Sequence, residues 1–275
     1  MREYHFSDVL NYTQGQLSEM HNASFQGYFV PLEMTARMSA DFWRINQVDA
    51  ALSVVMHERE GAFVGLARVG SRGKRGWCGG FGIVPDFRGS GASTLLATEM
   101  VRVARASGLE SMQLEILAQN VRAIKLYEKV GFVKTRRLLG LEIASAALPA
   151  EAAARVERVS LEELLPAFHR GRRPAWSNEL PALLSMNLAA FALVSPGGER
   201  NGILVQHANE KMRVVAALLG ETVTTPAVAA LLKTAAGEAQ SVQVYNEAEG
   251  SLFLEHCQRL GFGEWFTQYE MLLQF

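Results

Sequence analysis

The sequence predicts an α/β protein made of two related halves, each a mixed, largely antiparallel sheet with flanking helices. Three observations lead to this class. Stretches of alternating apolar residues, typical of strands, are interspersed with apolar residues at helical spacing. A strand, a glycine turn, a helix and a second strand follow one another over residues 77–117. Finally, features of the first half recur in the second half at a fixed distance.

Length and composition favour two ordinary globular domains. The chain has 275 residues, of which 49% are hydrophobic and 20% charged, and its formal net charge is −1. That length suits two domains of about 100 to 150 residues each. No basic block occurs beyond the short turn at residues 72–75, so we expect no nucleic-acid partner.

The cysteines and the N-terminus favour a reduced, cytoplasmic protein. Cys78 and Cys257 lie far apart and outside any metal-ligand pattern, so no metal site is expected. The first ten residues lack the apolar core of a signal peptide. The most apolar later stretch, residues 180–194, is too short and too interrupted to span a membrane, and it is interpreted as a core helix running into a strand.

The first half shows a clear order of elements. Strands are expected at residues 2–6, 51–58, 63–69, 77–84, 111–117 and 133–142, and helices at 13–23, 32–45, 94–106 and 122–129. The strands at 51–58, 63–69 and 77–84 are expected to run antiparallel. A helix joins the strands at 77–84 and 111–117, so a right-handed crossover makes these two strands parallel.

The glycine turn after residue 84 is the most informative stretch. Glycines at 79, 80 and 82 interrupt an apolar strand, which indicates a bulge or a close approach of the backbone to another group. Pro85 ends the strand, and small residues at 89–93 lead into a helix. Such a turn directs unpaired backbone N–H groups at one point, which is typical of an anion site and points to a phosphate-bearing ligand.

Two motifs together give a family resemblance. The pattern RxxGxG/A at Arg88, Gly91 and Ser93, with Asn120 and the run AIKLYEKVGF at residues 123–132, resembles the GNAT superfamily of acetyl-CoA-dependent N-acyltransferases. The resemblance covers residues 1–142. Ser93 departs from the Gly or Ala that the family normally has there, but serine is small and keeps its N–H.

The resemblance implies a site for acetyl-CoA. In the family the two parallel strands splay apart, which frees backbone groups for the pantetheine arm, and the glycine turn holds the pyrophosphate. The residues that would contact the cofactor are Ile83, Val84, Arg88, Gly89, Ser90, Gly91, Ala92, Ser93, Asn120, Ala123 and Tyr127. Ile83 and Val84 are expected to act through their backbone N–H groups. Asn120 is equally suited to cap the helix that follows it.

Acetyl transfer to an amine needs a proton donor for the departing thiolate and a base for the amine. Tyr127 is the expected acid. Glu115 is the leading candidate for the base, while His57 and Glu58 on a neighbouring strand, or a water chain to a carboxylate, remain alternatives.

The aromatic segment at residues 25–31 forms either a hydrophobic plug or a wall of the acceptor pocket. In the family this region lies over the acceptor site. The substrate-binding candidates are therefore Phe25, Tyr28 and Phe29.

The second half reads as a degenerate copy of the first. Ser111, Gln113, Gly131 and Phe132 recur as Ser241, Gln243, Gly261 and Phe262, each 130 residues later. At the same distance Asn120 becomes Gly250 and Tyr127 becomes Cys257, and residues 218–225 lack the arginine and glycines of the turn. Helices are expected in this half at residues 161–169 and 178–186. We expect a linker at 144–154, a catalytic domain at 1–146 and a domain without a coenzyme A site at 147–275.

Two functions from different classes follow from these residues. The first is transfer of an acetyl or short acyl group from acetyl-CoA to a primary amine of a small molecule or peptide. The second is a non-catalytic acyl-CoA sensor, and the presence of Tyr127 favours the enzyme. Neither nucleic acid nor a membrane is expected as a partner, and the sequence leaves the oligomeric state open.

Overall fold

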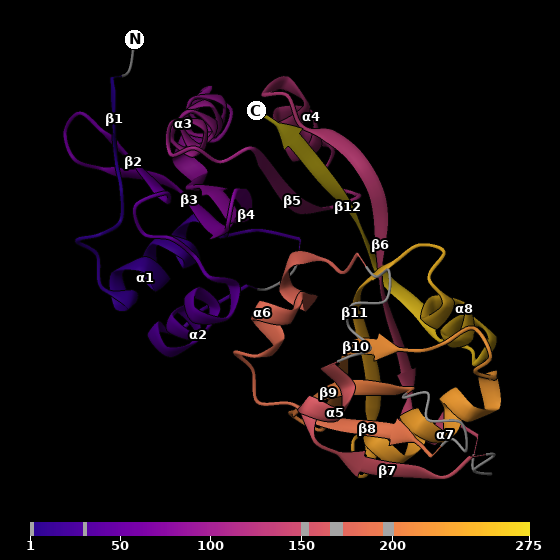
Figure 1. Cartoon of the computed structure of the whole chain (residues 1–275). Coiled ribbons are helices and arrows are strands. Elements are labelled where there is room, and N and C mark those ends of the chain that lie inside the picture. The colour runs from indigo at the N-terminus through magenta and orange to yellow at the C-terminus, as the bar shows by residue number, and fades with distance from the viewer. Residues whose placement is uncertain (1–2, 30–31, 150–153, 166–172, 195–200) are drawn as a thin grey trace. The chain divides into compact units, whose positions relative to one another are not determined.

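The computed structural model describes all residues except 1–2, 30–31, 150–153, 166–172 and 195–200 (Figure 1). The chain divides into two compact units. The first unit contains residues 1–135 and, from the far end of the chain, residues 269–275; the second contains residues 136–268. The division therefore falls inside strand β6 (Val133–Ala144), earlier than the expected one after residue 146. Of the expected linker, Ser145–Ala147 form a 3-10 helix and residues 150–153 lie outside the described part.

The first unit confirms the α/β class. Its strands follow the order β1-β2-β3-β4-β5-β12. Its elements are β1 (Tyr4–Ser7), α1 (Gln14–Ser24), α2 (Ala36–Asn46), β2 (Val54–Glu58), β3 (Phe63–Arg72), β4 (Arg75–Ile83), the 3-10 helix η1 (Pro85–Phe87), α3 (Ala92–Ala106), β5 (Ser111–Leu117), α4 (Val121–Lys129), the start of β6 and the end of β12 (Gly263–Gln274). The first four strands pair antiparallel, and β4 pairs parallel with β5.

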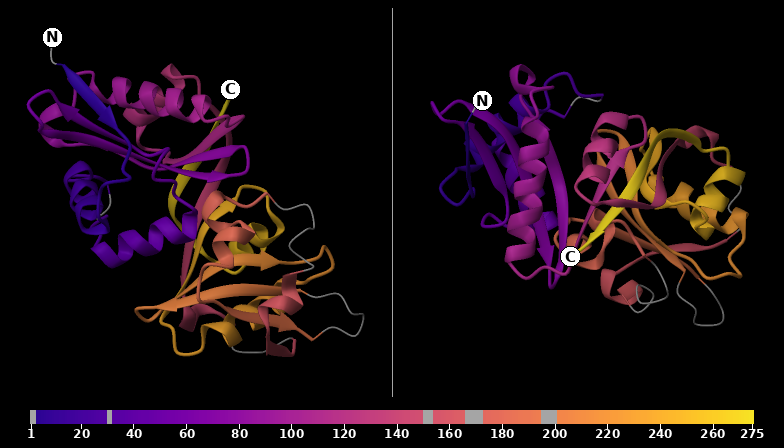
Figure 2. Two further views of the ribbon diagram at one scale, coloured as in Figure 1. Left: turned by 60° about the vertical axis from the view of Figure 1, so that its left-hand side comes forward. Right: turned by 90° about the horizontal axis from the view of Figure 1, so that it is seen from above.

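Side-chain alternation along the strands places helices on both faces of this sheet. On β2, Val54 and Met56 join the core beneath α3 and α4, whereas Val55 joins a separate core with Leu17 of α1 and Trp43 of α2. Successive strand residues point to opposite faces, so one strand supplies both cores. Figure 2 shows α3 on one face of the sheet and α1 and α2 on the other.

The end of the chain completes the first unit. Met271 is fully buried and Leu273 nearly so, and both belong to the core beneath α3. The N–H of Phe275 donates to the carbonyl of Glu110 at 3.0 Å, and the Thr135 hydroxyl donates to the carbonyl of Glu270 at 3.1 Å. The last strand therefore lies between β5 and the start of β6 in the first unit (Figure 1).

The second unit repeats this architecture with the strand order β6-β11-β10-β9-β8-β7. Its elements are β7 (Val156–Val159), α5 (Leu161–Leu164), the 3-10 helix η4 (Trp176–Asn178), α6 (Leu180–Leu183), β8 (Ala189–Leu193), β9 (Gly202–Ala208), β10 (Lys211–Leu218), α7 (Thr225–Ala236), β11 (Ser241–Ala248), α8 (Leu252–Arg259) and the first part of β12. Strands β10 and β11 are parallel, as β4 and β5 are in the first unit.

Two helices expected in the second unit are shorter than the sequence indicated. The expected helix at 161–169 is helical over Leu161–Leu164, and its residues 166–169 lie outside the described part. The expected helix at 178–186 is divided at Glu179, whose backbone is extended. The reason is Pro181, which has no N–H to donate and therefore fits only the first turn of the short helix that begins at Leu180.

Candidate functional site

Strands β4 and β5 separate part of the way along the first unit's sheet. They pair from Arg75 with Ser111 as far as Cys78 with Leu114. Strand β4 then continues to Ile83 along β3 alone, and β5 continues to Leu117. The edge of β4 that faces β5 is therefore left with backbone groups that this pairing does not use.

The two backbone N–H groups expected to face this opening have different roles. The N–H of Val84 donates to the carbonyl of Val64 at 3.0 Å, so the expectation that it binds the cofactor is corrected. Because N–H groups alternate sides along a strand, the N–H of Ile83 points away from β3 and towards the opening. Of the pair, Ile83 alone remains a candidate.

The three glycines of β4 make room for other groups. A Cβ on Gly79 would lie 1.9 Å from the ring of Trp77, one on Gly80 would lie 2.3 Å from the guanidinium of Arg68, and one on Gly82 would lie 2.6 Å from Ser24. The strand register also shifts between Arg68 and Val69. The close approach and the bulge inferred from the sequence are both present.

The glycine turn leaves the N-terminus of α3 without a side-chain cap. Gly89 and Gly91 have φ values of +79° and +91°, which favour glycine, and a Cβ on either would meet nothing within 4 Å. Gly91 is the N-cap of α3 and has no side chain to cap that end, and the N–H of Ala92 donates to the Ser90 hydroxyl in a long hydrogen bond of 3.4 Å. By contrast, Thr13, Thr35 and Asn120 cap α1, α2 and α4. Exposed N–H groups and the helix dipole at Gly91 favour an anion there.

Other residues of the turn hold its shape. Arg88 donates from Nε to the carbonyl of Ile83 at 2.9 Å and from Nη2 to those of Ser24 and Gln26 at 3.1 and 2.7 Å. Its guanidinium thus connects the turn to the end of α1. The Ser90 hydroxyl donates to the carbonyl of Phe87 at 2.7 Å. Ala92 is buried and Ser93 half-buried in the first turn of α3.

Tyr127 lies in the core of the first unit with its hydroxyl at the Cys78 thiol. Its side chain is 5% exposed, and its ring packs edge-on against Phe81 and Phe132. Burial raises the pKa of Tyr127 well above its usual value, and the neighbouring Cys78 and Tyr28 raise it further. The hydroxyl therefore stays protonated at neutral pH.

Cys78 is a further candidate site residue, which no sequence pattern indicated. It is the last β4 residue paired with β5, and only the structure shows that register. Burial raises the pKa of its thiol to about 11, while the hydrogen bond with Tyr127 and the charge of Arg68 lower it and the charge of Glu115 raises it. The thiol is therefore protonated, and Tyr127, Arg68 and Glu115 all act on it.

Glu115 is the candidate base that lies beside this opening. It follows the last paired residue of β5, and its carboxylate accepts a hydrogen bond from the indole N–H of Trp77 at 2.6 Å. His57 lies on β2 between the rings of Tyr12 and Phe63, and Glu58 follows it. Strands β3 and β4 separate both from β5, so Glu115 is the best placed of the three.

The aromatic segment after α1 reaches the start of α4. Phe25 packs against His21, Tyr28 against Phe25, and Phe29 against Tyr28, with ring centroids 4.5 to 5.4 Å apart. The Tyr28 hydroxyl hydrogen-bonds to Asn120, whereas Phe29 is 54% exposed. Asn120 also accepts from the N–H of Ala123 at 3.2 Å, so its role as the cap of α4 is confirmed.

In the second unit, side chains bond to the backbone at the two positions that correspond to this site. Its parallel pair ends at Val214 with Val244, and Asn178 then donates to the carbonyl of Tyr245 at 2.9 Å. The N-terminus of α7 is capped by the side chain of Thr224. In the second unit, therefore, the chain's own side chains bond both to the backbone beyond the paired strands and to the N-terminus of the joining helix.

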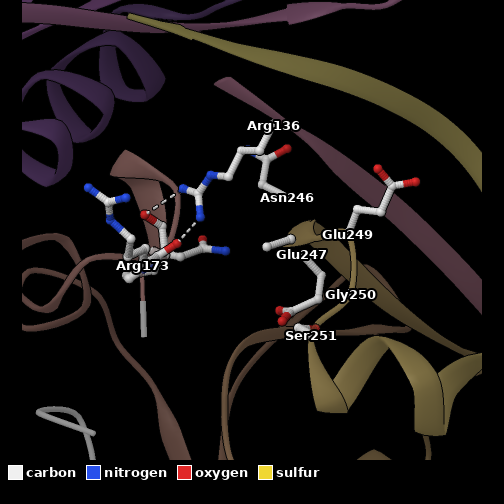
Figure 3. Close-up of a pocket in the computed structure, with 10 residues that line it drawn as sticks. Arg136, Arg173, Asn246, Glu247, Glu249, Gly250 and Ser251 are labelled. Atoms are coloured by element: carbon white, nitrogen blue, oxygen red, sulfur yellow. Dashed lines mark hydrogen bonds between the residues drawn. The ribbon is translucent and has the colours of Figure 1, made fainter. Parts of the chain in front are cut away.

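A pocket of about 280 Å³ remains in the second unit at the end of β11 (Figure 3). Arg136 and Arg173 line it together with Glu247 and Glu249, so charges of both signs face it. Arg136 donates to the backbone carbonyls of Arg173 and Pro174. This mixed lining favours no single class of ligand.

The described residues contain neither a metal-binding cluster nor a membrane-spanning helix. No group of three His, Cys, Asp or Glu side chains is placed to hold a metal ion within that part of the chain. None of the helices it contains is long and apolar enough to cross a membrane.

Comparison with known proteins gave one family and a set of similar folds. Residues 16–132 match the acetyltransferase (GNAT) family model, and no curated protein matches the chain. A GCN5-related N-acetyltransferase from Sphaerobacter thermophilus is similar with a TM-score of 0.71 at 16% identity, over 98% of this chain and 95% of that one. A tandem GNAT protein from the clavulanic acid biosynthesis pathway has a TM-score of 0.70 at 12% identity, over 100% and 98%.

A third solved structure has a similar fold. A putative acetyltransferase from Pyrococcus horikoshii has a TM-score of 0.67 at 14% identity and covers 99% of this chain and 89% of that one. At such identities the likeness concerns the fold alone, and it extends over both units.

Proposed function

We propose that this chain is an N-acetyltransferase, because residues 16–132 match the acetyltransferase (GNAT) family model and members of that family transfer acyl groups from acyl-coenzyme A. The acyl donor is acetyl-CoA, and the acceptor is a primary amine of a small molecule or peptide. The first unit carries the activity, and the second is a degenerate copy without a coenzyme A site.

The observation that carries this proposal is the uncapped N-terminus of α3 beside the separated strands. Gly89 and Gly91 leave open space around the first N–H groups of the helix, which suits a pyrophosphate. The N–H groups of Ser90 and Ala92 already donate to Phe87 and to the Ser90 hydroxyl, so those of Gly89, Gly91 and Ser93 would hold it. The N–H of Ile83 would bind the pantetheine arm. When bound, acetyl-CoA supplies an acyl group activated as a thioester.

The chain's own residues supply the proton transfers. Tyr127 is protonated and contacts Cys78, the last β4 residue that pairs with β5, which supports its role as the donor of a proton to the departing thiolate. Glu115 would accept the proton that the amine loses, directly or through a water molecule. As the new C–N bond forms and the C–S bond breaks, these two groups keep the charges balanced.

One experiment separates this enzyme from the acyl-CoA sensor. The full chain is incubated with acetyl-CoA and a panel of primary amines, and free thiol release is measured beside binding by calorimetry. We expect amine-dependent release and a stoichiometry of one acetyl-CoA per chain. Saturable binding without release for any amine would favour the sensor, and a stoichiometry of two would contradict the degenerate second site.

A further inference from the structure

Arg68 is a buried cation for which the described residues provide no carboxylate. Its side chain is 3% exposed, and its Nε has no hydrogen-bond partner. Nη2 lies 2.9 Å from Nδ1 of His21, Nη1 lies 3.5 Å from the sulfur of Met34, and Cζ lies 4.4 Å above the ring of Phe42. Burial lowers the pKa of Arg68 to about 10, so the group is still charged at neutral pH.

The partners of Arg68 are all neutral. His21 is 2.7 Å from the carbonyl of Leu32 through Nε2, so Nε2 carries the hydrogen and Nδ1 accepts from Arg68. A thioether is a weak acceptor, and the face of an aromatic ring only partly replaces a carboxylate. A buried charge without a counter-charge is costly, which suggests that a ligand supplies the missing anion.

The position of Arg68 connects it to the proposed acceptor side. It lies on β3 opposite Gly80, whose missing side chain leaves the space that the guanidinium fills. Its neighbours come from α1, the segment before α2, and α2 itself. The charges of Arg68 and Glu115 both act on the Cys78 thiol, which also contacts Tyr127. The Arg68 guanidinium and the Glu115 carboxylate therefore both lie near the point where β4 and β5 separate.

We propose that the acceptor amine carries a carboxylate and that Arg68 binds it, with the free Nε–H donating to the carboxylate. The substrate class is thus a free amino acid or a similar amino-carboxylate, whose amine lies towards Glu115. A carboxylate suits this site better than a phosphate, since one buried guanidinium balances one negative charge. This inference rests on the proposed N-acetyltransferase activity.

The test compares each standard amino acid with its own carboxamide as the acceptor for the full chain. A charge-assisted hydrogen bond predicts a preference for the acid of about 10- to 100-fold in kcat/KM, mostly through KM. Arg68→Gln should abolish this preference, so that the ratio of kcat/KM for the acid to kcat/KM for the carboxamide falls to about 1. Arg213→Gln is the control, because Arg213 is half-buried with a buried, unpartnered Nε but belongs to the second unit.

Binding provides a readout that is independent of turnover. Calorimetry of the same acids against the wild-type chain should detect binding that Arg68→Lys weakens and Arg213→Gln leaves unchanged. Equal turnover of acids and amides would overturn the carboxylate inference and leave the acetyltransferase proposal standing. Binding of acids with no thiol release from any acceptor would instead overturn the acetyltransferase proposal alone.

Discussion

Nη2 of Arg68 lies 2.9 Å from Nδ1 of His21, and this contact holds the imidazole in its neutral form. Burial lowers the pKa of His21 to about 4, and the charge of Arg68 adds to that effect. In the unfolded chain the same histidine titrates near its ordinary value of 6.5. The difference makes folding stability dependent on pH.

We predict that the first unit loses stability as the pH falls from about 6.5 to about 4. Above pH 6.5 His21 is neutral in both the folded and the unfolded chain, so it contributes nothing to the pH dependence of stability. Between these pH values His21 is protonated in the unfolded chain but neutral in the folded chain. This difference lowers the free energy of unfolding by about 2 kcal/mol. Denaturant unfolding between pH 4 and 8 measures this, and His21→Gln should flatten that part of the profile.

A second prediction concerns the glycine turn. Gly91→Asp should weaken acetyl-CoA binding by both bulk and like charge, since the residue caps the end of α3 that would hold the pyrophosphate. Gly91→Asn is the matched control, because asparagine has the same size, tolerates a positive φ and carries no charge. Calorimetry should rank affinity as wild type, then Asn, then Asp. Equal affinity for all three folded proteins would refute the site.

The third prediction tests Tyr127 as the acid. Tyr127→Phe keeps the ring in its contacts with Phe81 and Phe132 and removes only the proton donor. We expect kcat to fall by about 10² to 10⁴ with acetyl-CoA affinity nearly unchanged. Tyr269→Phe, in the last strand, is the control and should keep full activity. If Tyr127→Phe transfers the acetyl group at the wild-type rate in a single turnover, Tyr127 is not the acid, and the thiolate receives its proton from solvent.

The fourth prediction concerns the end of the chain. Met271 is fully buried in the core of the first unit, so Met271→Ala should lower the free energy of unfolding by about 2 to 5 kcal/mol. Gln274 in the same strand is exposed, and Gln274→Ala should change stability by less than about 0.5 kcal/mol. Chemical denaturation of the wild type and the two variants measures these changes in the free energy of unfolding.

The same strand decides how a truncated chain behaves. Residues 1–146 alone lack residues 269–275 and would expose the apolar surface that Met271 and Leu273 cover, so we predict a poorly soluble or much less active protein. Joining residue 135 through a short glycine-containing turn to residues 269–275 should restore solubility, because Thr135 contacts Glu270. A soluble, fully active fragment of residues 1–146 would contradict this prediction.

The sequence by itself determined the order of elements, the parallel strand pair, the glycine turn and the resemblance that singles out Tyr127. These depend on neighbours a few residues away: alternation defines a strand, and Gly91 defines a turn. The strand Ser111–Leu117 was therefore placed to the residue.

Only the tertiary structure decided which groups meet across long separations. The apolar alternation of Met271 and Leu273 would suit either unit, and their pairing partners lie more than a hundred residues away in the chain. Likewise, the direction of the Val84 N–H depends on its register with β3, and the burial of Arg68 depends on helices packed over that strand. Sequence periodicity specifies which face of an element is buried, but not which distant segment covers it.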